Sequence, residues 1–188
     1  MNNTFTTIGA SNHSDTVRSL NDYYATDPVA ILYLKKYNLL TDAKYWECAC
    51  GKGNLSRQLE KIGYEVKSTD LFDYNYGVAG VDFLECDEVF NGNIITNPPF
   101  KLVNEFIKKG LELASDRLYI FARIQILEGL KRYEEIFRIN PPVYVCPFVK
   151  RIKCEINGEF PKESAICYAW FIWDNKDNNG ETKVKWLI

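Results

Sequence analysis

The chain has 188 residues, of which 46% are hydrophobic and 26% charged, a balance that suits one globular domain with a sizeable buried core. No apolar run reaches membrane-spanning length, and the polar start of the sequence lacks the layout of a signal peptide, so we expect a cytoplasmic protein that does not enter a membrane. The net charge of -2 excludes a globally basic surface, so any face that binds nucleic acid must be local.

Metal binding is not expected from the cysteine and histidine content. Cys48 and Cys50 are only one residue apart, and no Cys-x-x-Cys motif or histidine cluster supplies further ligands. The single histidine, His13, lies in the polar N-terminal stretch. We interpret the six cysteines as reduced thiols, because nothing in the sequence indicates export.

Strand and helix signals alternate along most of the chain. Residues 1–20 are polar and without periodicity, which predicts a flexible tail, and residues 21–188 are expected to form one domain. Asp27 and Pro28 predict the start of the first helix. Expected helices cover residues 29–37, 55–62, 103–114 and 127–137. Expected strands cover residues 45–49, 65–69, 79–83, 93–96, 118–124, 143–149 and 165–173, with a turn at Asn157 and Gly158.

This alternation predicts an α/β fold with a mostly parallel sheet and helices on both faces. The last two strands have no helix between them, so the sheet is expected to end in an antiparallel pair, or terminal hairpin. Ligands of such sheets gather at the carboxyl ends of the strands. Residues that directly follow strands are therefore the candidates for function.

Three of these strand ends carry candidate ligand-binding residues. Gly51 and Gly53 permit a tight turn and close backbone approach to a ligand, although such turns also serve only to pack a helix on a sheet. Asp70 ends the second strand, where a carboxylate can accept hydrogen bonds from two ribose hydroxyls or simply cap a turn. Asp82 and Phe83 end the third strand. They can receive an adenine amino group and cover the base, or be a loop acid beside a core ring.

The sharpest signal is the run Asn97, Pro98, Pro99 and Phe100 after the fourth strand. Two prolines fix the backbone and remove two N–H donors, so carbonyl oxygens and the Asn97 side-chain oxygen can converge on one amino group. Phe100 adds a flat apolar surface. The alternative is a Pro-Pro loop that only leads the chain out of a strand.

This run resembles the catalytic signature of the S-adenosylmethionine-dependent amino-methyltransferases, a group that includes DNA adenine-N6 methylases, RNA adenine methylases and glutamine-N5 protein methylases. Residues 47–53 resemble their cofactor-binding turn, with Cys48 in place of the usual proline. Residues 24–28 resemble the upstream element that touches the methionine end of the cofactor, although Asp27 separates Thr26 from Pro28. The resemblance covers roughly residues 22–173, and the compact chain looks most like phage and prophage adenine methylases.

The resemblance implies a Rossmann-like methyltransferase fold, S-adenosyl-L-methionine as the cofactor and direct in-line methyl transfer to adenine N6 in DNA. RNA methylation, protein glutamine-N5 methylation and a catalytically silent binding subunit are the alternatives. The implied catalytic residues are Asn97, Pro98, Pro99 and Phe100. The implied cofactor-binding residues are Tyr24, Thr26, Glu47, Ala49, Gly51, Gly53, Asp70, Leu71, Asp82, Phe83 and Asn97.

Nucleic-acid contacts are expected from a local basic group. Lys150, Arg151 and Lys153 form the densest cluster of positive charge and are candidates for phosphate contacts, with a solvated face as the alternative. Tyr74 and Tyr76 are candidates to flank a nucleobase or the cofactor.

The spacing of the motifs bears on target selection. Only about 45 residues separate Gly53 from Asn97, which leaves no room there for a target-recognition domain. We therefore expect low sequence selectivity, or dependence on a partner or oligomer for recognition of the target.

Overall fold

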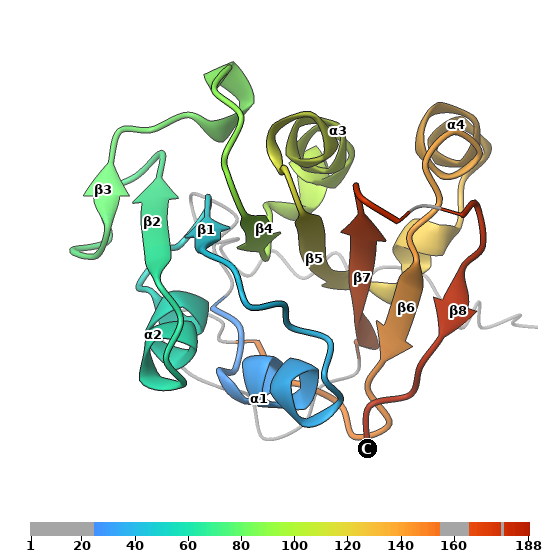
Figure 1. Cartoon of the computed structure of the whole chain (residues 1–188), viewed down its shortest axis with the longest axis horizontal. Coiled ribbons are helices and arrows are strands. Elements are labelled where there is room, and N and C mark those ends of the chain that lie inside the picture. Colours follow the sequence, from blue (N-terminus) through green and yellow to red (C-terminus); the bar gives the residue numbers. More distant parts are fainter. Residues whose placement is uncertain (1–24, 155–165, 178) are drawn as a thin grey trace, which may run out of the picture.

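One twisted sheet organises the computed structural model, which describes residues 25–154, 166–177 and 179–188 (Figure 1). Within this part the strand order is β3-β2-β1-β4-β5-β7-β6-β8. The strands are β1 (Tyr45–Glu47), β2 (Val66–Asp70), β3 (Val78–Ala79), β4 (Asn93–Thr96), β5 (Arg117–Arg123), β6 (Tyr144–Pro147), β7 (Tyr168–Asp174) and β8 (Lys183–Val184).

The pairing of the strands confirms the fold expected from the sequence. All neighbouring pairs from β3 to β5 are parallel, whereas β7 runs antiparallel to both β5 and β6. The additional strand β8 pairs in parallel with β6 at the edge of the sheet. The mostly parallel sheet and its antiparallel pair were thus predicted correctly, while β8 was not expected, because its two exposed residues carry no apolar alternation.

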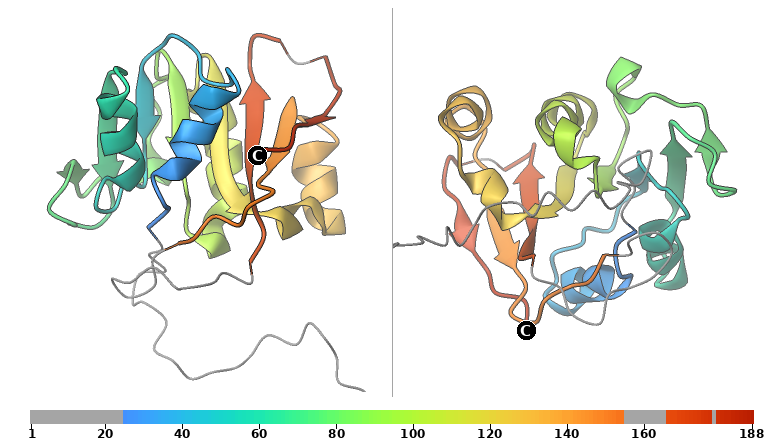
Figure 2. Two further views of the ribbon diagram at one scale, coloured as in Figure 1. Left: turned by 90° about the horizontal axis from the view of Figure 1, so that it is seen from below. Right: turned by 180° about the vertical axis from the view of Figure 1, so that it is seen from behind.

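Helices cover both faces of the sheet, as the two further views also show (Figure 1; Figure 2). On one face lie α1 (Val29–Lys36) and α2 (Asn54–Lys61), and on the other α3 (Val103–Leu113) and α4 (Leu130–Arg132). The expected start of α1 is confirmed, since the Val29 N–H donates to Asp27 Oδ1 at 2.9 Å.

Each face has its own buried core, and α2 and α3 contribute through apolar residues at helical spacing. Leu55 and Leu59 of α2 pack with α1 and with aromatic residues of β5 and β7. Phe106 and Ile107 of α3 pack with Trp46 of β1 on the opposite face. The sheet is therefore buried on both sides, which is typical of parallel sheets.

The strand expected at residues 79–83 is wrong in its extent. β3 contains only Val78–Ala79, and Gly80 follows with φ 78°. The Asp82 side chain then accepts a hydrogen bond from the Leu84 N–H at 3.0 Å and begins a 3-10 turn at Phe83–Glu85. A polar cap therefore ends the extended conformation early and turns Phe83 into the core.

The helix expected at residues 127–137 also begins later than predicted. A 3-10 turn at Ile124–Leu127 comes first, and Gly129 with φ 109° separates it from α4. A π-helical turn at Tyr133–Phe137 continues α4. The expected tail at residues 1–20, Tyr24 and the turn at residues 157–158 lie outside the described residues. No helix in the described part is long and apolar enough to cross a membrane.

A buried hydrogen bond joins the two strands whose ends carry the first candidate residues. Trp46 Nε1 on β1 donates to Thr69 Oγ1 on β2 at 2.8 Å, and both residues are 2% exposed. The bond fixes β1 against β2 directly below Glu47 and Asp70. The loop after β1 and the end of β2 are therefore held in one register.

We predict that Thr69→Val lowers the free energy of unfolding by about 1–3 kcal/mol, because the buried Trp46 N–H loses its acceptor while the side-chain shape is kept. Urea denaturation measures the effect. In a Trp46→Phe background the same change should have little effect, so a double-mutant cycle isolates the bond. Equal losses in both backgrounds would contradict this prediction.

Candidate cofactor and catalytic pocket

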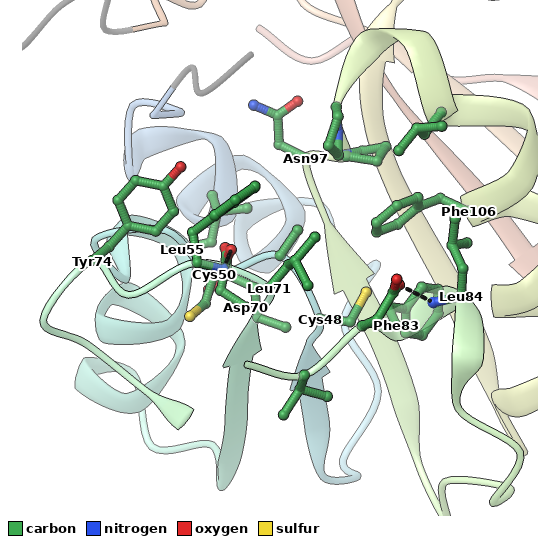
Figure 3. Close-up of a pocket in the computed structure, with 18 of the residues that line it drawn as sticks. Cys48, Cys50, Leu55, Asp70, Leu71, Tyr74, Phe83, Leu84, Asn97 and Phe106 are labelled. Atoms are coloured by element: carbon green, nitrogen blue, oxygen red, sulfur yellow. Dashed lines mark hydrogen bonds between the residues drawn. The ribbon is translucent and has the colours of Figure 1, made fainter. Parts of the chain in front are cut away.

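A cavity of about 410 Å³ lies at the carboxyl ends of β1, β2 and β4 (Figure 3). This volume falls within the usual range of small-molecule sites. In Figure 3, Asp70 and Cys50 lie on one side of the cavity, Leu84 and Phe106 on the other, and Asn97 at its upper end. The predicted site residues that line it are Thr26, Glu47, Ala49, Asp70, Leu71, Asp82, Phe83, Asn97, Pro98, Pro99 and Phe100.

Asp70 joins the ends of β1 and β2. Its Oδ2 accepts from the Gly51 N–H at 2.8 Å, and its Oδ1 accepts from the Phe72 N–H at 2.9 Å. The residue is 7% exposed and lines the cavity. Each carboxylate oxygen has lone pairs beyond the one used here, so Asp70 can hold the loop and still accept from a ligand.

Glu47 ties the end of β1 to the first turn of α2. Its Oε2 accepts from the Ser56 N–H at 2.8 Å and from the Ser56 hydroxyl, which in turn accepts from the Ser68 hydroxyl at 2.7 Å. Burial raises the pKa of Glu47 to about 8, and the two Ser56 donors oppose that rise. Glu47 is thus a buried, hydrogen-bonded carboxyl group on the wall of the cavity.

The two glycines of the turn are not among the residues that line the cavity. The Gly51 N–H donates to Asp70, so Gly51 contacts a residue of the cavity wall without lining the cavity itself. Gly53 has φ 79°, and a Cβ atom there would lie 2.2 Å from the Tyr76 ring. Gly53 therefore leaves room for the Tyr76 ring. The spacing of the glycines in the sequence does not distinguish this role from close approach of a ligand.

Asp82 and Phe83 lie on opposite sides of the boundary between cavity and core. Asp82 is exposed and caps the 3-10 turn. The Phe83 ring is 2% exposed and packs at 5.4 Å from Trp46 and 5.1 Å from Phe106, measured between ring centroids. Phe83 thus borders the cavity as part of the core, while Leu71, at 49% exposed, offers the freer apolar surface.

The Asn-Pro-Pro-Phe run forms a defined turn between β4 and α3. Pro99 has φ -53° and ψ 130°, and its carbonyl accepts from the Leu102 N–H at 2.9 Å, which closes the 3-10 turn Phe100–Leu102. Asn97 is half-buried, with its side-chain oxygen shielded from solvent. All four residues of the run line the cavity.

Phe100 is held by two neighbours, one from β5 and one from β7. The Arg123 guanidinium carbon lies 4.2 Å from the ring centroid, and the Tyr168 ring is stacked at 6.5 Å with an interplanar angle of 28°. One face of Phe100 is therefore covered within the protein. Arg123 was not recognised in the sequence, although its position at the carboxyl end of β5 is the kind of position that marks a candidate.

The expected basic group lies beside the cavity and does not line it. Lys150 and Arg151 are exposed, and the Lys153 carbonyl accepts from the Asp27 N–H at 3.1 Å. Thr26, which lines the cavity, forms an antiparallel bridge with Cys154. The chain that carries the basic group is thus docked on the segment that precedes α1.

Sequence reasoning missed several further residues of the cavity wall. Asn54 begins α2 and donates from Nδ2 to the Thr26 carbonyl at 3.2 Å, and Lys101 follows the Asn-Pro-Pro-Phe run. Of the two tyrosines singled out, Tyr74 lines the cavity. Tyr76 instead lies under Arg57, whose guanidinium carbon is 4.3 Å from the ring centroid.

We predict that the Glu47 carboxyl group makes stability fall as pH rises from 4.5 to about 8. Between these two pH values the Glu47 carboxyl group is ionised in the unfolded chain but still protonated in the native chain. Each rise in pH across this window therefore favours the unfolded chain, and the contribution of Glu47 to stability is largest below pH 4.5. Urea denaturation across this range should show the slope in the native chain, and Glu47→Gln should remove that component.

The matched variant is Ser56→Ala. Its hydroxyl lowers the Glu47 pKa, so its removal should extend the falling limb to higher pH. A native chain and a Glu47→Gln variant with the same pH dependence would show that folding does not raise the pKa of Glu47.

The sequence matches no known protein-family model and no curated protein. Solved structures nevertheless share its fold. A Pyrococcus horikoshii protein provisionally assigned as an RNA methyltransferase is 16% identical and aligns with a TM-score of 0.58 over 77% of this chain and 81% of its own. A Thermoplasma acidophilum protein is 16% identical, with a TM-score of 0.54 over 78% of this chain and 85% of its own.

A third similar structure is the modification subunit of a provisionally assigned type I restriction enzyme from Vibrio vulnificus. It is 13% identical, with a TM-score of 0.58 over 92% of this chain and 48% of its own, so this chain spans about half the length of that subunit. Together with the strand order and the helices on both faces, these similarities show that the chain has the Rossmann-like fold of S-adenosylmethionine-dependent methyltransferases.

Proposed function

We propose that this chain transfers a methyl group from S-adenosylmethionine to N6 of adenine in DNA. The observation that carries the proposal is one cavity that joins the acidic ends of β1 and β2 to the Asn-Pro-Pro-Phe turn after β4. The fold alone is compatible with many acceptors. The turn supports an amino group as the acceptor, because it has oxygen acceptors beside an aromatic ring.

The residues at the carboxyl ends of β1 to β3 fit the proposed cofactor. The Asp70 carboxylate can accept from ribose hydroxyls with the lone pairs that Gly51 and Phe72 leave free. Asp82 is exposed at the opposite edge, where it can accept from an adenine amino group. Leu71 and Cys48 supply apolar wall between them. The acids also suit the positive charge of a sulfonium.

The bound cofactor supplies an electrophilic methyl group on a sulfonium sulfur. The chain's own residues hold the acceptor nitrogen in line with it. The adenine N6 lone pair is delocalised into the ring, so the free amino group is a poor nucleophile. The Pro98 carbonyl and, once its side chain turns toward the cavity, the Asn97 side-chain oxygen can each accept a hydrogen bond from one of its N–H groups and favour tetrahedral geometry. The N–C bond would form as the S–C bond breaks, with a neutral thioether as the leaving group, and the nitrogen would then lose one proton to solvent. Catalysis then rests on positioning and electrostatics, with no covalent intermediate on the enzyme.

RNA adenine is the second candidate acceptor. Its support is the similar fold of the Pyrococcus horikoshii protein assigned as an RNA methyltransferase, whereas the Vibrio vulnificus modification subunit supports DNA equally. A base in a duplex must leave the stack to enter the cavity, so single strands are the simplest substrate of either kind. Nucleoside analysis of DNA and RNA from cells that express the chain separates the two candidates. New N6-methyladenine in DNA supports DNA as the substrate, and new N6-methyladenine in RNA supports RNA.

We predict that Asp70→Ala lowers the affinity for S-adenosylmethionine by about tenfold or more, since the lost hydrogen bonds are together worth roughly 1–3 kcal/mol. Isothermal calorimetry measures it. The matched control is Asp73→Ala, because Asp73 Oδ1 accepts from the Asn75 N–H at 2.8 Å outside the cavity. Absence of binding by the native chain, or equal losses in both variants, would contradict the cofactor assignment.

We predict that Asn97→Ala lowers turnover on an adenine oligonucleotide by about a hundredfold or more and leaves cofactor affinity nearly unchanged. The reason is that its contact with the amino group strengthens only as the nitrogen gains tetrahedral character. Single-turnover methylation measures the rate.

The control for lost stability is Asn175→Ala, which removes an amide that donates to the Ala114 carbonyl far from the cavity. Near-native turnover by a folded Asn97→Ala variant would remove the catalytic role of the turn. Phe100→Ala is expected to weaken oligonucleotide binding, both through lost stacking and through release of Arg123.

A further inference from the structure

Arg123 occupies a position in the sheet that points to a role beside the catalytic turn. It is the last residue of β5 and lies directly opposite Tyr168 of β7. β5 pairs in parallel with β4, and Asn97 follows β4, so both residues lie at the same edge of the sheet. Arg123 itself is half-buried and does not line the cavity, but its guanidinium group covers Phe100, which does.

The hydrogen-bonding capacity of Arg123 is not filled by the described part of the protein. Its side chain interacts with the Tyr168 hydroxyl, but Nε is buried and has no hydrogen-bond partner among the described residues. The ion pairs formed within the described ranges use Lys44, Lys108, Lys109, Arg117, Lys131 and Lys176, and none involves Arg123. Because Nε is buried, an outside anion can reach Arg123 only through its terminal nitrogens, whose charge no acid among the described residues neutralises.

Arg57 provides a comparison, because it also stacks on an aromatic ring but lies outside the cavity. Its guanidinium carbon lies 4.3 Å from the Tyr76 ring centroid, close to the 4.2 Å between Arg123 and Phe100. Arg57 is exposed, however, and its Nε donates to the Lys52 carbonyl at 3.5 Å. Tyr76 does not line the cavity. The two stacks share geometry, but of these two the Arg123 stack adjoins the cavity and has a donor, Nε, without a partner among the described residues.

Charge is also unevenly distributed around the cavity. The carboxyl groups of Asp70 and Asp82 belong to the end of β2 and the turn after β3, and the protonated Glu47 adds no charge to them. The positive side chains Lys101 and Arg123 flank the Phe100 end. A cationic cofactor at one end and a polyanionic acceptor at the other would match this distribution.

We propose that Arg123 binds a backbone phosphate next to the target nucleotide while it braces Phe100 for the base. The inference rests on the proposed function and deepens it, because it selects a nucleic acid over a glutamine side chain as the acceptor. A target base inside the cavity leaves its phosphates outside, beside the wall where Arg123 lies. The two terminal nitrogens of an arginine can bind a phosphate bidentately.

The test uses single-stranded oligonucleotides with one adenine, in which each phosphate near that adenine is replaced in turn by an uncharged methylphosphonate. In the native chain, replacement at one flanking position should weaken binding about tenfold. Arg123→Met should weaken binding of the unmodified strand by a similar factor and lower the slope of log Kd against log salt concentration by about 0.7 to 1. In this variant, the methylphosphonate at that one position should no longer affect binding. Arg123→Lys keeps the charge and should keep most of the sensitivity.

The matched control is Arg57→Met, which removes an equivalent arginine–aromatic stack and should leave the whole replacement pattern unchanged. If the native chain binds and methylates the oligonucleotide but Arg123→Met shows the same response to each methylphosphonate, the phosphate contact is wrong. Arg123 would then only support the Phe100 ring. Failure of the native chain to bind or methylate any adenine oligonucleotide would overturn the proposed function, and the phosphate contact with it.

Discussion

The hydrogen bond from the Gly51 N–H to the Asp70 carboxylate is the constraint on which the pocket depends. It closes the gap between the loop after β1 and the end of β2, and the Cys50 N–H donates to the Thr69 carbonyl at 3.0 Å beside it. Because Gly51 has φ 51°, the turn presents its N–H toward the neighbouring strand. Glu47 secures the other side of the same loop through Ser56. The loop is thus fixed by two acids before any ligand is present.

This arrangement explains why acids are needed at positions that a ligand would also use. A backbone N–H that is buried without a partner destabilises a fold, so each strand end needs an acceptor. A carboxylate can satisfy such donors and retain lone pairs that face the cavity. The structural and the binding interpretations of Asp70 are therefore compatible, and neither excludes the other.

Much of this arrangement could be predicted from the sequence, and the reason lies in strand ends. The parallel order brings the carboxyl ends of β1, β2 and β4 together, so acids and an Asn-Pro-Pro-Phe run that are far apart in sequence meet in one cavity. Two of the details that failed depend on tertiary partners: Tyr76 occupies the space beside Gly53, and Arg123 becomes relevant when β5 aligns it with Phe100. The third is local, because Asp82 caps the turn that follows β3. Local pattern marks Arg123 as a strand-end residue and Asp82 as a loop acid, but it does not show which partners they contact.

The location of the positive charge makes a net charge of -2 compatible with the proposed nucleic-acid substrate. A phosphate responds to charges within about a Debye length, roughly 8–10 Å at ordinary salt, so the total charge of the surface matters less than the few groups beside the entrance. Lys101 and Arg123 flank the Phe100 end, and the chain that carries Lys153 is docked on the segment before α1. A phosphate beside the Phe100 end would therefore meet these groups first, so the proposed acceptor needs positive charge at this place only and not over the whole surface.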